Sequence, residues 1–186
     1  MQLPVITFPT WLTIVRIALV PFIIAAIIHD QWTVAVLHFF IAVITDFFDG
    51  FLARRWKQES ALGAALDPLA DKLLMLGCFF TLAFVQTSAF QIPRWFFIVL
   101  LAKELFLIIG FLILNFLKKE PFIAQSTILG KLAACAQFLF VFIVLVGQFF
   151  NMHITGMYPI SLFLILVLTL SALVQYLYSG YRFLVR

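Results

Sequence analysis

Residues 32–48 read WTVAVLHFFIAVITDFF, an apolar run of the length that crosses a lipid bilayer as a helix. Its one charged residue, Asp46, stands close to the end of the run. The whole chain of 186 residues has the same character, since 65% of it is hydrophobic and only 11% is charged. No soluble domain needs apolar residues in that proportion. Lipid must therefore be the solvent for most of the protein surface.

Five more apolar runs of similar length occur along the chain, separated by short polar segments. At about 20 residues for each crossing, the chain has room for six helices and little else. We therefore predict an all-α polytopic integral membrane protein with six transmembrane helices and a single domain over residues 1–186. The predicted spans are Leu12–Ile28, Trp32–Phe48, Leu62–Val85, Trp95–Leu117, Leu132–Phe150 and Ile160–Tyr178.

The basic residues predict the orientation, because short cytoplasmic loops retain Lys and Arg. With six spans, only Arg94 falls on one side of the membrane. We therefore expect both termini to be cytoplasmic. The net charge of +4 suits anionic headgroups, so no nucleic-acid partner is needed to explain it. The basic residues on the other side are Arg54, Arg55, Lys57, Lys118, Lys119, Lys131, Arg182 and Arg186.

Four aspartates, in a chain with eight acidic residues, lie within 26 positions at the predicted cytoplasmic ends of spans two and three. Asp46 and Asp49 are three residues apart and Asp67 and Asp71 four apart, so each pair shares one face of a helix. Four carboxylates this close would repel one another unless cations neutralised them. Ligation by oxygen alone favours Mg²⁺ or Mn²⁺, and we expect two ions. Ionisable residues in spans are costly and usually functional.

Small and basic residues accompany these aspartates. Gly50, Ala53 and Gly63 remove side-chain bulk near the acidic faces, so that a helix or a nucleotide can approach closely. Arg54 supplies positive charge that a diphosphate needs where metal ions do not reach it. The sequence thus predicts a metal site beside a space for a phosphate-containing ligand.

The pattern from Asp46 to Asp71, D-x2-D-G-x2-A-R-x8-G-x3-D-x3-D, resembles the signature of the CDP-alcohol phosphatidyltransferase family, and every fixed position is filled. The resemblance implies that two divalent metals bind a CDP-linked lipid such as CDP-diacylglycerol, that CMP is displaced, and that the phosphatidyl group joins an alcohol. It also implies a homodimer. The likeness extends to an N-terminal element containing Pro9, Thr10, Leu12, Thr13, Arg16 and Pro21.

The resemblance carries roles to the matching positions of this chain. It makes Asp71 the general base for the acceptor hydroxyl as well as a metal ligand. Direct displacement is expected, since the motif contains no Ser, Cys or His to act as a nucleophile. The implied metal ligands are Asp46, Asp49, Asp67 and Asp71, and the implied CDP-binding residues are Asp46, Gly50, Ala53, Arg54 and Gly63.

Two branches of the family differ in the acceptor, which is glycerol 3-phosphate in one and phosphatidylglycerol in the other. Lys103 and Glu104 lie deep in the fourth span and are candidates for the acceptor pocket, with Lys131 and Arg16 as further cations. Phe111 and Ala133 stand where the glycerol 3-phosphate branch typically has cations, which weakens that assignment. Length, short loops and the lack of a visible transit peptide favour a bacterial inner-membrane enzyme. The sequence favours glycerol 3-phosphate and leaves phosphatidylglycerol open.

Two other classes of protein use carboxylates within a membrane. An intramembrane prenyltransferase also binds a diphosphate through aspartates and magnesium on helices, but its motifs lack the spacing seen here. A cation transporter would place its site near the bilayer midplane, often within related repeats. The aspartates of this chain cluster at one end of their spans, and no repeat is evident. Both classes are therefore more distant alternatives.

Overall fold

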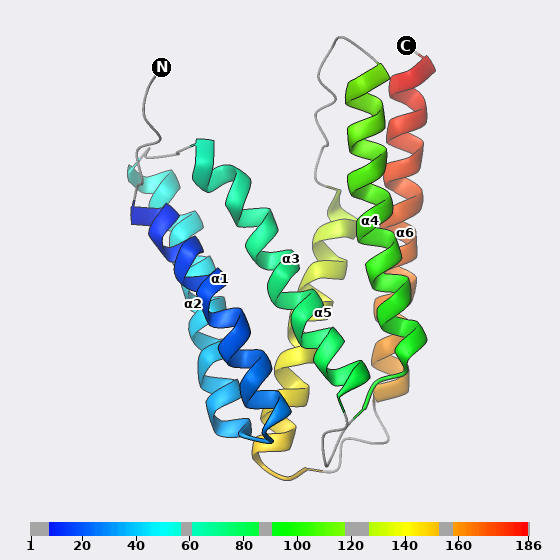
Figure 1. Ribbon diagram of the computed structural model, residues 1–186. Helices are drawn as coiled ribbons and strands as arrows, with labels where there is room; N and C mark the ends of the chain where they lie inside the picture. The colour runs from blue at the N-terminus through cyan, green and yellow to red at the C-terminus, as the bar shows by residue number, and fades with distance from the viewer. Residues whose placement is uncertain (1–7, 57–60, 86–90, 118–126, 153–157, 186) are drawn as a thin grey trace. The chain divides into compact units, whose positions relative to one another are not determined.

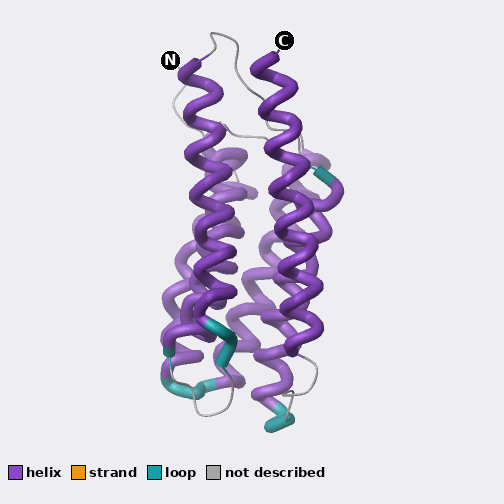
Figure 2. Tube along the Cα trace, turned by 90° about the vertical axis from the view of Figure 1, so that its right-hand side faces the viewer, coloured by secondary structure: helices purple, strands orange, loops and turns teal. Residues whose placement is uncertain are grey.

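The fold is known from a computed structural model, which describes residues 8–56, 61–85, 91–117, 127–152 and 158–185. Those residues form six helices and no strand (Figures 1 and 2). The predicted all-α class is confirmed. The helices are α1 (Phe8–Ile28), α2 (Trp32–Trp56), α3 (Ala61–Phe84), α4 (Arg94–Leu117), α5 (Ile128–Phe149) and α6 (Tyr158–Val185).

Four of these helices, α1, α4, α5 and α6, contain segments long and apolar enough to cross a membrane. The acidic motif lies on α2 and α3, which are about as long as the other four helices but carry more charged residues in their apolar sequence. In α2, of 25 residues, the apolar segment is Trp32–Asp46. In α3, of 24 residues, Asp67, Asp71 and Lys72 interrupt the apolar sequence. The charged motif thus lies on two helices as long as their neighbours.

Two helices end in the same type of cap. At the end of α1, Asp30 adopts a left-handed φ of 54°, and the amide of Gln31 donates to the carbonyl of Ala26 at 2.8 Å. At the end of α5, Asn151 has a φ of 53°, and the amide of Met152 donates to Gly147 at 2.8 Å. Asp and Asn tolerate this backbone conformation better than most residues. The first cap makes the turn to α2 short, so α1 and α2 are antiparallel neighbours.

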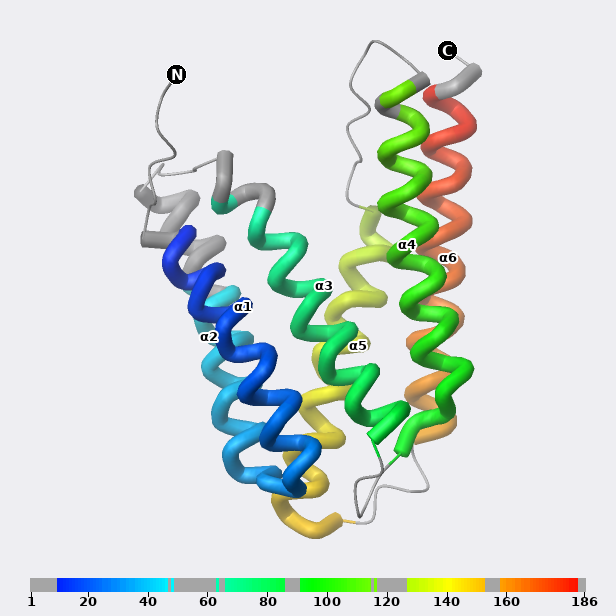
Figure 3. Tube along the Cα trace, in the orientation of Figure 1, coloured from blue at the N-terminus to red at the C-terminus, as the bar shows by residue number. Residues whose placement is uncertain are grey.

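The helices group into two compact units. The first holds α1, α2, α3 and α5 from Val141 onward, and the second holds α4, α5 up to Phe140, and α6. The single domain over residues 1–186 stays a prediction. In the first unit α1 packs against both α2 and α3 (Figure 3). Ile23 and Ile27 of α1 and Leu74 of α3 are fully buried there. Hence α1 can bring a side chain to both helices that carry the acidic motif.

The contact between α1 and α3 depends on Gly77. A Cβ atom at this position would lie 3.0 Å from Cδ1 of Ile24 and 3.3 Å from Cγ1 of Val20. We predict that Gly77→Val destabilises the protein by about 1–3 kcal/mol, because the added methyl groups overpack a filled contact. Unfolding in detergent measures the effect. Gly110→Val is the control, since a Cβ there would meet only Tyr176, at 3.9 Å. Equal stability of the two variants would contradict the prediction.

In the second unit α4 packs against α6 (Figure 1). Gly180 of α6 brings the helices close, since a Cβ there would lie 3.3 Å from Leu114 of α4. The side-chain amide of Gln137 on α5 donates a hydrogen bond to the hydroxyl of Thr169 on α6, at 3.3 Å. Large apolar side chains are exposed on these helices, among them Phe116 and Ile160. Such side chains suit a lipid-facing surface.

Candidate active site

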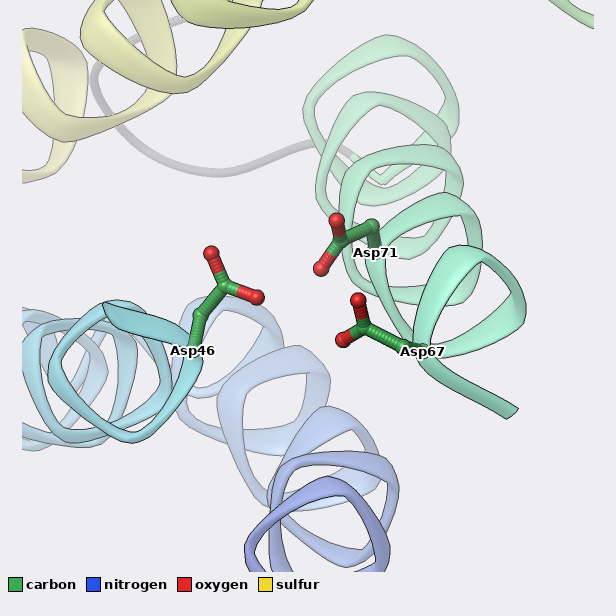
Figure 4. A group of neighbouring side chains, drawn as sticks. All are labelled: Asp46, Asp67 and Asp71. Carbon is green, nitrogen blue, oxygen red and sulfur yellow. The ribbon is translucent and has the colours of Figure 1, made fainter. Parts of the chain in front are cut away.

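Three of the four aspartates of the motif face one another across α2 and α3. Asp46 comes from α2, and Asp67 and Asp71 lie one turn apart on α3 (Figure 4). One carboxylate oxygen from each lies within 4.8 Å of the others. The three side chains are 36–45% exposed. The predicted meeting of the two acidic faces is therefore seen for these three residues.

A cation from α1 completes this cluster. Nη1 of Arg16 lies 2.7 Å from Oδ1 of Asp46, 3.0 Å from Oδ1 of Asp67 and 2.8 Å from Oδ1 of Asp71. The Arg16 side chain is 0% exposed. Sequence reasoning assigned Arg16 to the acceptor and missed these contacts. The available signal was its place in an apolar span, where a charged residue needs a partner of opposite charge.

The face of α1 that carries Arg16 is polar over two turns. Thr10 and Thr13 precede Arg16 at intervals of three residues, so all three project to the same side of the helix. Both threonines are buried, with 1% and 2% of their surface exposed. Because α1 packs on α2 and α3, this polar face lies inside the first unit. This buried polar face of α1 ends at Arg16, which contacts all three aspartates.

The donor set fits a divalent metal ion. All three groups are carboxylates, the ligands that Mg²⁺ and Mn²⁺ prefer. Oxygens opposite each other on Mg²⁺ are about 4.2 Å apart, and those of Asp46, Asp67 and Asp71 already lie within 4.8 Å. The cluster can thus hold a metal ion between α2 and α3.

Several of the predicted site residues have side chains that the structure does not describe. The side chains of Asp49, Gly50, Ala53 and Arg54 on α2 are outside the described residues, so their roles stay predictions. Gly63 lies on α3, one turn before Asp67. It is therefore on the same side of α3 as the carboxylates.

The predicted acceptor residues other than Arg16 belong to the second unit. Lys103 and Glu104 on α4 form an ion pair with each other, and their side chains are only 14% and 16% exposed. Lys131 lies on the first turn of α5 and is exposed. The aspartates belong to the first unit. The acceptor role of all three residues stays a prediction.

The similarity of this chain to known proteins extends well beyond the carboxylate cluster and covers nearly the whole sequence. The family model described as CDP-alcohol phosphatidyltransferase matches residues 6–177. The chain belongs to this family. It is therefore a phosphatidyltransferase and an integral membrane protein, which separates it from the prenyltransferases and cation transporters considered above.

Relatives of the chain come from several bacteria. A protein of Sodalis glossinidius (strain morsitans) is 32% identical over 181 residues, which cover 94% of this chain and 95% of that protein. One of Pectobacterium atrosepticum is 33% identical over 175 residues, covering 91% and 92%. One of Yersinia enterocolitica is 48% identical over 73 residues, covering 38% and 40%. All three are named CDP-diacylglycerol--glycerol-3-phosphate 3-phosphatidyltransferase.

Proposed function

We propose that this phosphatidyltransferase moves the phosphatidyl group of CDP-diacylglycerol to glycerol 3-phosphate, with release of CMP and formation of phosphatidylglycerophosphate. The observation that carries the proposal is the convergence of Asp46, Asp67 and Asp71 on one point. A diphosphate needs concentrated positive charge, and a carboxylate cluster between two membrane helices is suited to hold the cations that provide it. The names of relatives that match over nine-tenths of the chain support the acceptor.

The residues of the site suggest how the transfer proceeds. The acceptor hydroxyl oxygen attacks the phosphorus of the phosphatidyl group, and the bond from that phosphorus to the CMP oxygen breaks. CMP leaves with the bonding electron pair. Asp71 takes the proton of the hydroxyl, since a carboxylate beside the reacting groups can accept it as the new bond forms. Holding both substrates in line is the main task of the protein in such a transfer.

Two divalent ions, Mg²⁺ or Mn²⁺, would bind Asp46, Asp49, Asp67 and Asp71 and supply the positive charge for the diphosphate. Gly50, Ala53, Arg54 and Gly63, with Asp46, would border the CDP group. Support comes from the place of Gly63 one turn from Asp67 and from the position of the other residues on the last turns of α2. Small residues there leave room for a nucleotide.

The proposed setting is a bacterial inner membrane, with the site and both termini on the cytoplasmic side. The distribution of Lys and Arg supports this orientation. Water-soluble glycerol 3-phosphate and CMP would then reach and leave the site from the cytoplasm. A homodimer is proposed from family resemblance alone.

A second acceptor, phosphatidylglycerol, would make the protein a cardiolipin synthase. It is favoured by Phe111 and Ala133, apolar residues that stand where the glycerol 3-phosphate branch of the family typically has cations. The test is Mg²⁺-dependent CMP release by purified protein from CDP-diacylglycerol, with glycerol 3-phosphate in one reaction and phosphatidylglycerol in the other. We expect release with glycerol 3-phosphate. Release with phosphatidylglycerol alone would replace the proposal by the second acceptor.

Lys103 provides a separate prediction about the acceptor. Lys103→Ala removes a cation from the proposed phosphate pocket, and a charge-assisted hydrogen bond contributes about 1.5–3 kcal/mol. We therefore expect the acceptor KM to rise by about tenfold or more, with the KM for CDP-diacylglycerol changed much less. Arg182→Gln is the control, because Arg182 is an exposed cation on α6. Unchanged acceptor kinetics in Lys103→Ala would remove Lys103 from the pocket.

A further inference from the structure

Arg16 contacts an oxygen of each of the three aspartates. Its Nη1 atom lies within 3.0 Å of the Oδ1 atoms of Asp46, Asp67 and Asp71. An ionised carboxylate has two oxygens and about four acceptor positions, so each of these groups keeps further capacity for a cation. Arg16 therefore need not compete with metal ions for every ligand atom in the cluster.

Burial differs sharply across the cluster. Arg16 is 0% exposed, whereas the side chains of Asp46, Asp67 and Asp71 are 40%, 45% and 36% exposed. The cation of the cluster is thus buried, while the three carboxylates remain partly open to solvent. If a fully buried guanidinium ion moved away from its carboxylate partners, it would become an unpaired charge in a medium of low dielectric, which costs much free energy. We therefore expect Arg16 to remain in place when cations bind.

We propose that Arg16 is a positioning residue of the metal centre: from α1 it fixes the Oδ1 atoms of Asp46 on α2 and of Asp67 and Asp71 on α3, and so orients these carboxylates for divalent ions. The proposal rests on the proposed function for the presence of those ions. Hydrogen bonds to metal-binding carboxylates orient them and tune their affinity for the metal. The positive charge of Arg16 also offsets the repulsion among the three carboxylates.

This role differs from the acceptor contact that the sequence suggested for Arg16. A residue that contacts the acceptor alters the acceptor KM, even when metal ions saturate the enzyme. A residue that orients the carboxylates alters metal binding, even when no substrate is present. The two roles can thus be separated by measuring metal affinity and acceptor kinetics in the same variant.

The test is Mn²⁺ binding to purified protein in detergent without substrate, followed by electron paramagnetic resonance of free Mn²⁺. We expect Arg16→Gln to weaken Mn²⁺ binding by about 10–100-fold, the usual effect of losing a group that orients a metal ligand. Arg182→Gln, which removes an exposed cation from α6, should bind Mn²⁺ as the unaltered protein does. At saturating Mn²⁺ the acceptor KM of Arg16→Gln should be unchanged.

Two results would overturn the proposal. Folded Arg16→Gln that binds Mn²⁺ as tightly as the unaltered protein, or more tightly, would mean that Arg16 competes with the metal or does not affect it. An acceptor KM raised at saturating Mn²⁺ would return Arg16 to the acceptor pocket. If Arg16→Gln does not fold, Arg16→Lys decides in its place. Lysine keeps the charge but lacks the planar fork, so weaker Mn²⁺ binding is expected and unchanged binding overturns the proposal.

Failure of the proposed function would be seen separately. The Mn²⁺ titration contains no CDP-diacylglycerol and no acceptor, so it does not depend on which lipid the protein uses. Unaltered protein that binds Mn²⁺ but releases no CMP would reject the proposed function and leave the role of Arg16 standing. Unaltered protein that binds no Mn²⁺ would overturn the role of Arg16, whatever its activity.

Discussion

Asp71→Asn is expected to lower the rate of CMP release by about 10²–10⁴-fold, the usual contribution of a general base. Asparagine has nearly the same size as aspartate but cannot take the proton of the acceptor hydroxyl. It also removes one of the charges that gather around Nη1 of Arg16. CDP-diacylglycerol should still bind in part, because Asp46 and Asp67 remain. Steady-state CMP release at saturating Mg²⁺, with binding of CDP-diacylglycerol measured separately, gives both quantities.

The matched control for this variant is Asp30→Asn. Asp30 is exposed in the turn between α1 and α2, and asparagine accepts its left-handed backbone conformation as readily as aspartate does. We expect this control to keep its activity. Full activity in Asp71→Asn would refute the assignment of Asp71 as the base.

Removal of divalent cations is expected to lower the activity by about 10³-fold or more, since metal ions contribute several kcal/mol to stabilising the charge that develops in such a transfer. Without them the diphosphate would approach three carboxylates that have one arginine between them. CMP release should stop in EDTA and return when Mg²⁺ or Mn²⁺ is added in excess.

The concentration dependence of that recovery is a further check. Asp46→Asn removes one of the three converging carboxylates and should need more Mg²⁺ for half-maximal activity than the unaltered protein. Asp30→Asn should need the same amount. Undiminished activity in EDTA, after the protein has been stripped of bound ions, would contradict the metal centre.

Much of the fold could be predicted from composition and spacing. Apolar runs of about 20 residues can satisfy their backbone only as helices in lipid, so six runs predict six helices. The helix ends were harder to predict, because hydropathy marks the lipid-spanning part and not the end of the helix. The second span was expected to end at Phe48, whereas α2 continues to Trp56 through the charged motif. Likewise α5 begins at Ile128, where the Thr127 hydroxyl accepts a hydrogen bond from the amide of Gly130.

The candidate site was predictable where it depends on helical periodicity. Residues four apart on a helix share a face, so Asp67 and Asp71 had to point the same way, and a hairpin could bring them to Asp46. The partner of Arg16 was not predictable in the same way. It depends on how α1 packs against α2 and α3, and the partners on α3 lie 51 and 55 positions from Arg16 in the chain. Spacing within one helix carries no information about such a contact.

The most direct test of the central claim is the stoichiometry of transfer. Purified protein would be supplied with CDP-diacylglycerol, Mg²⁺ and isotopically labelled glycerol 3-phosphate, and CMP and labelled lipid would be measured in the same reaction. We expect one labelled phosphatidylglycerophosphate for each CMP, with both products lost together in Asp71→Asn. CMP released without labelled lipid, or no CMP released with glycerol 3-phosphate, would contradict it.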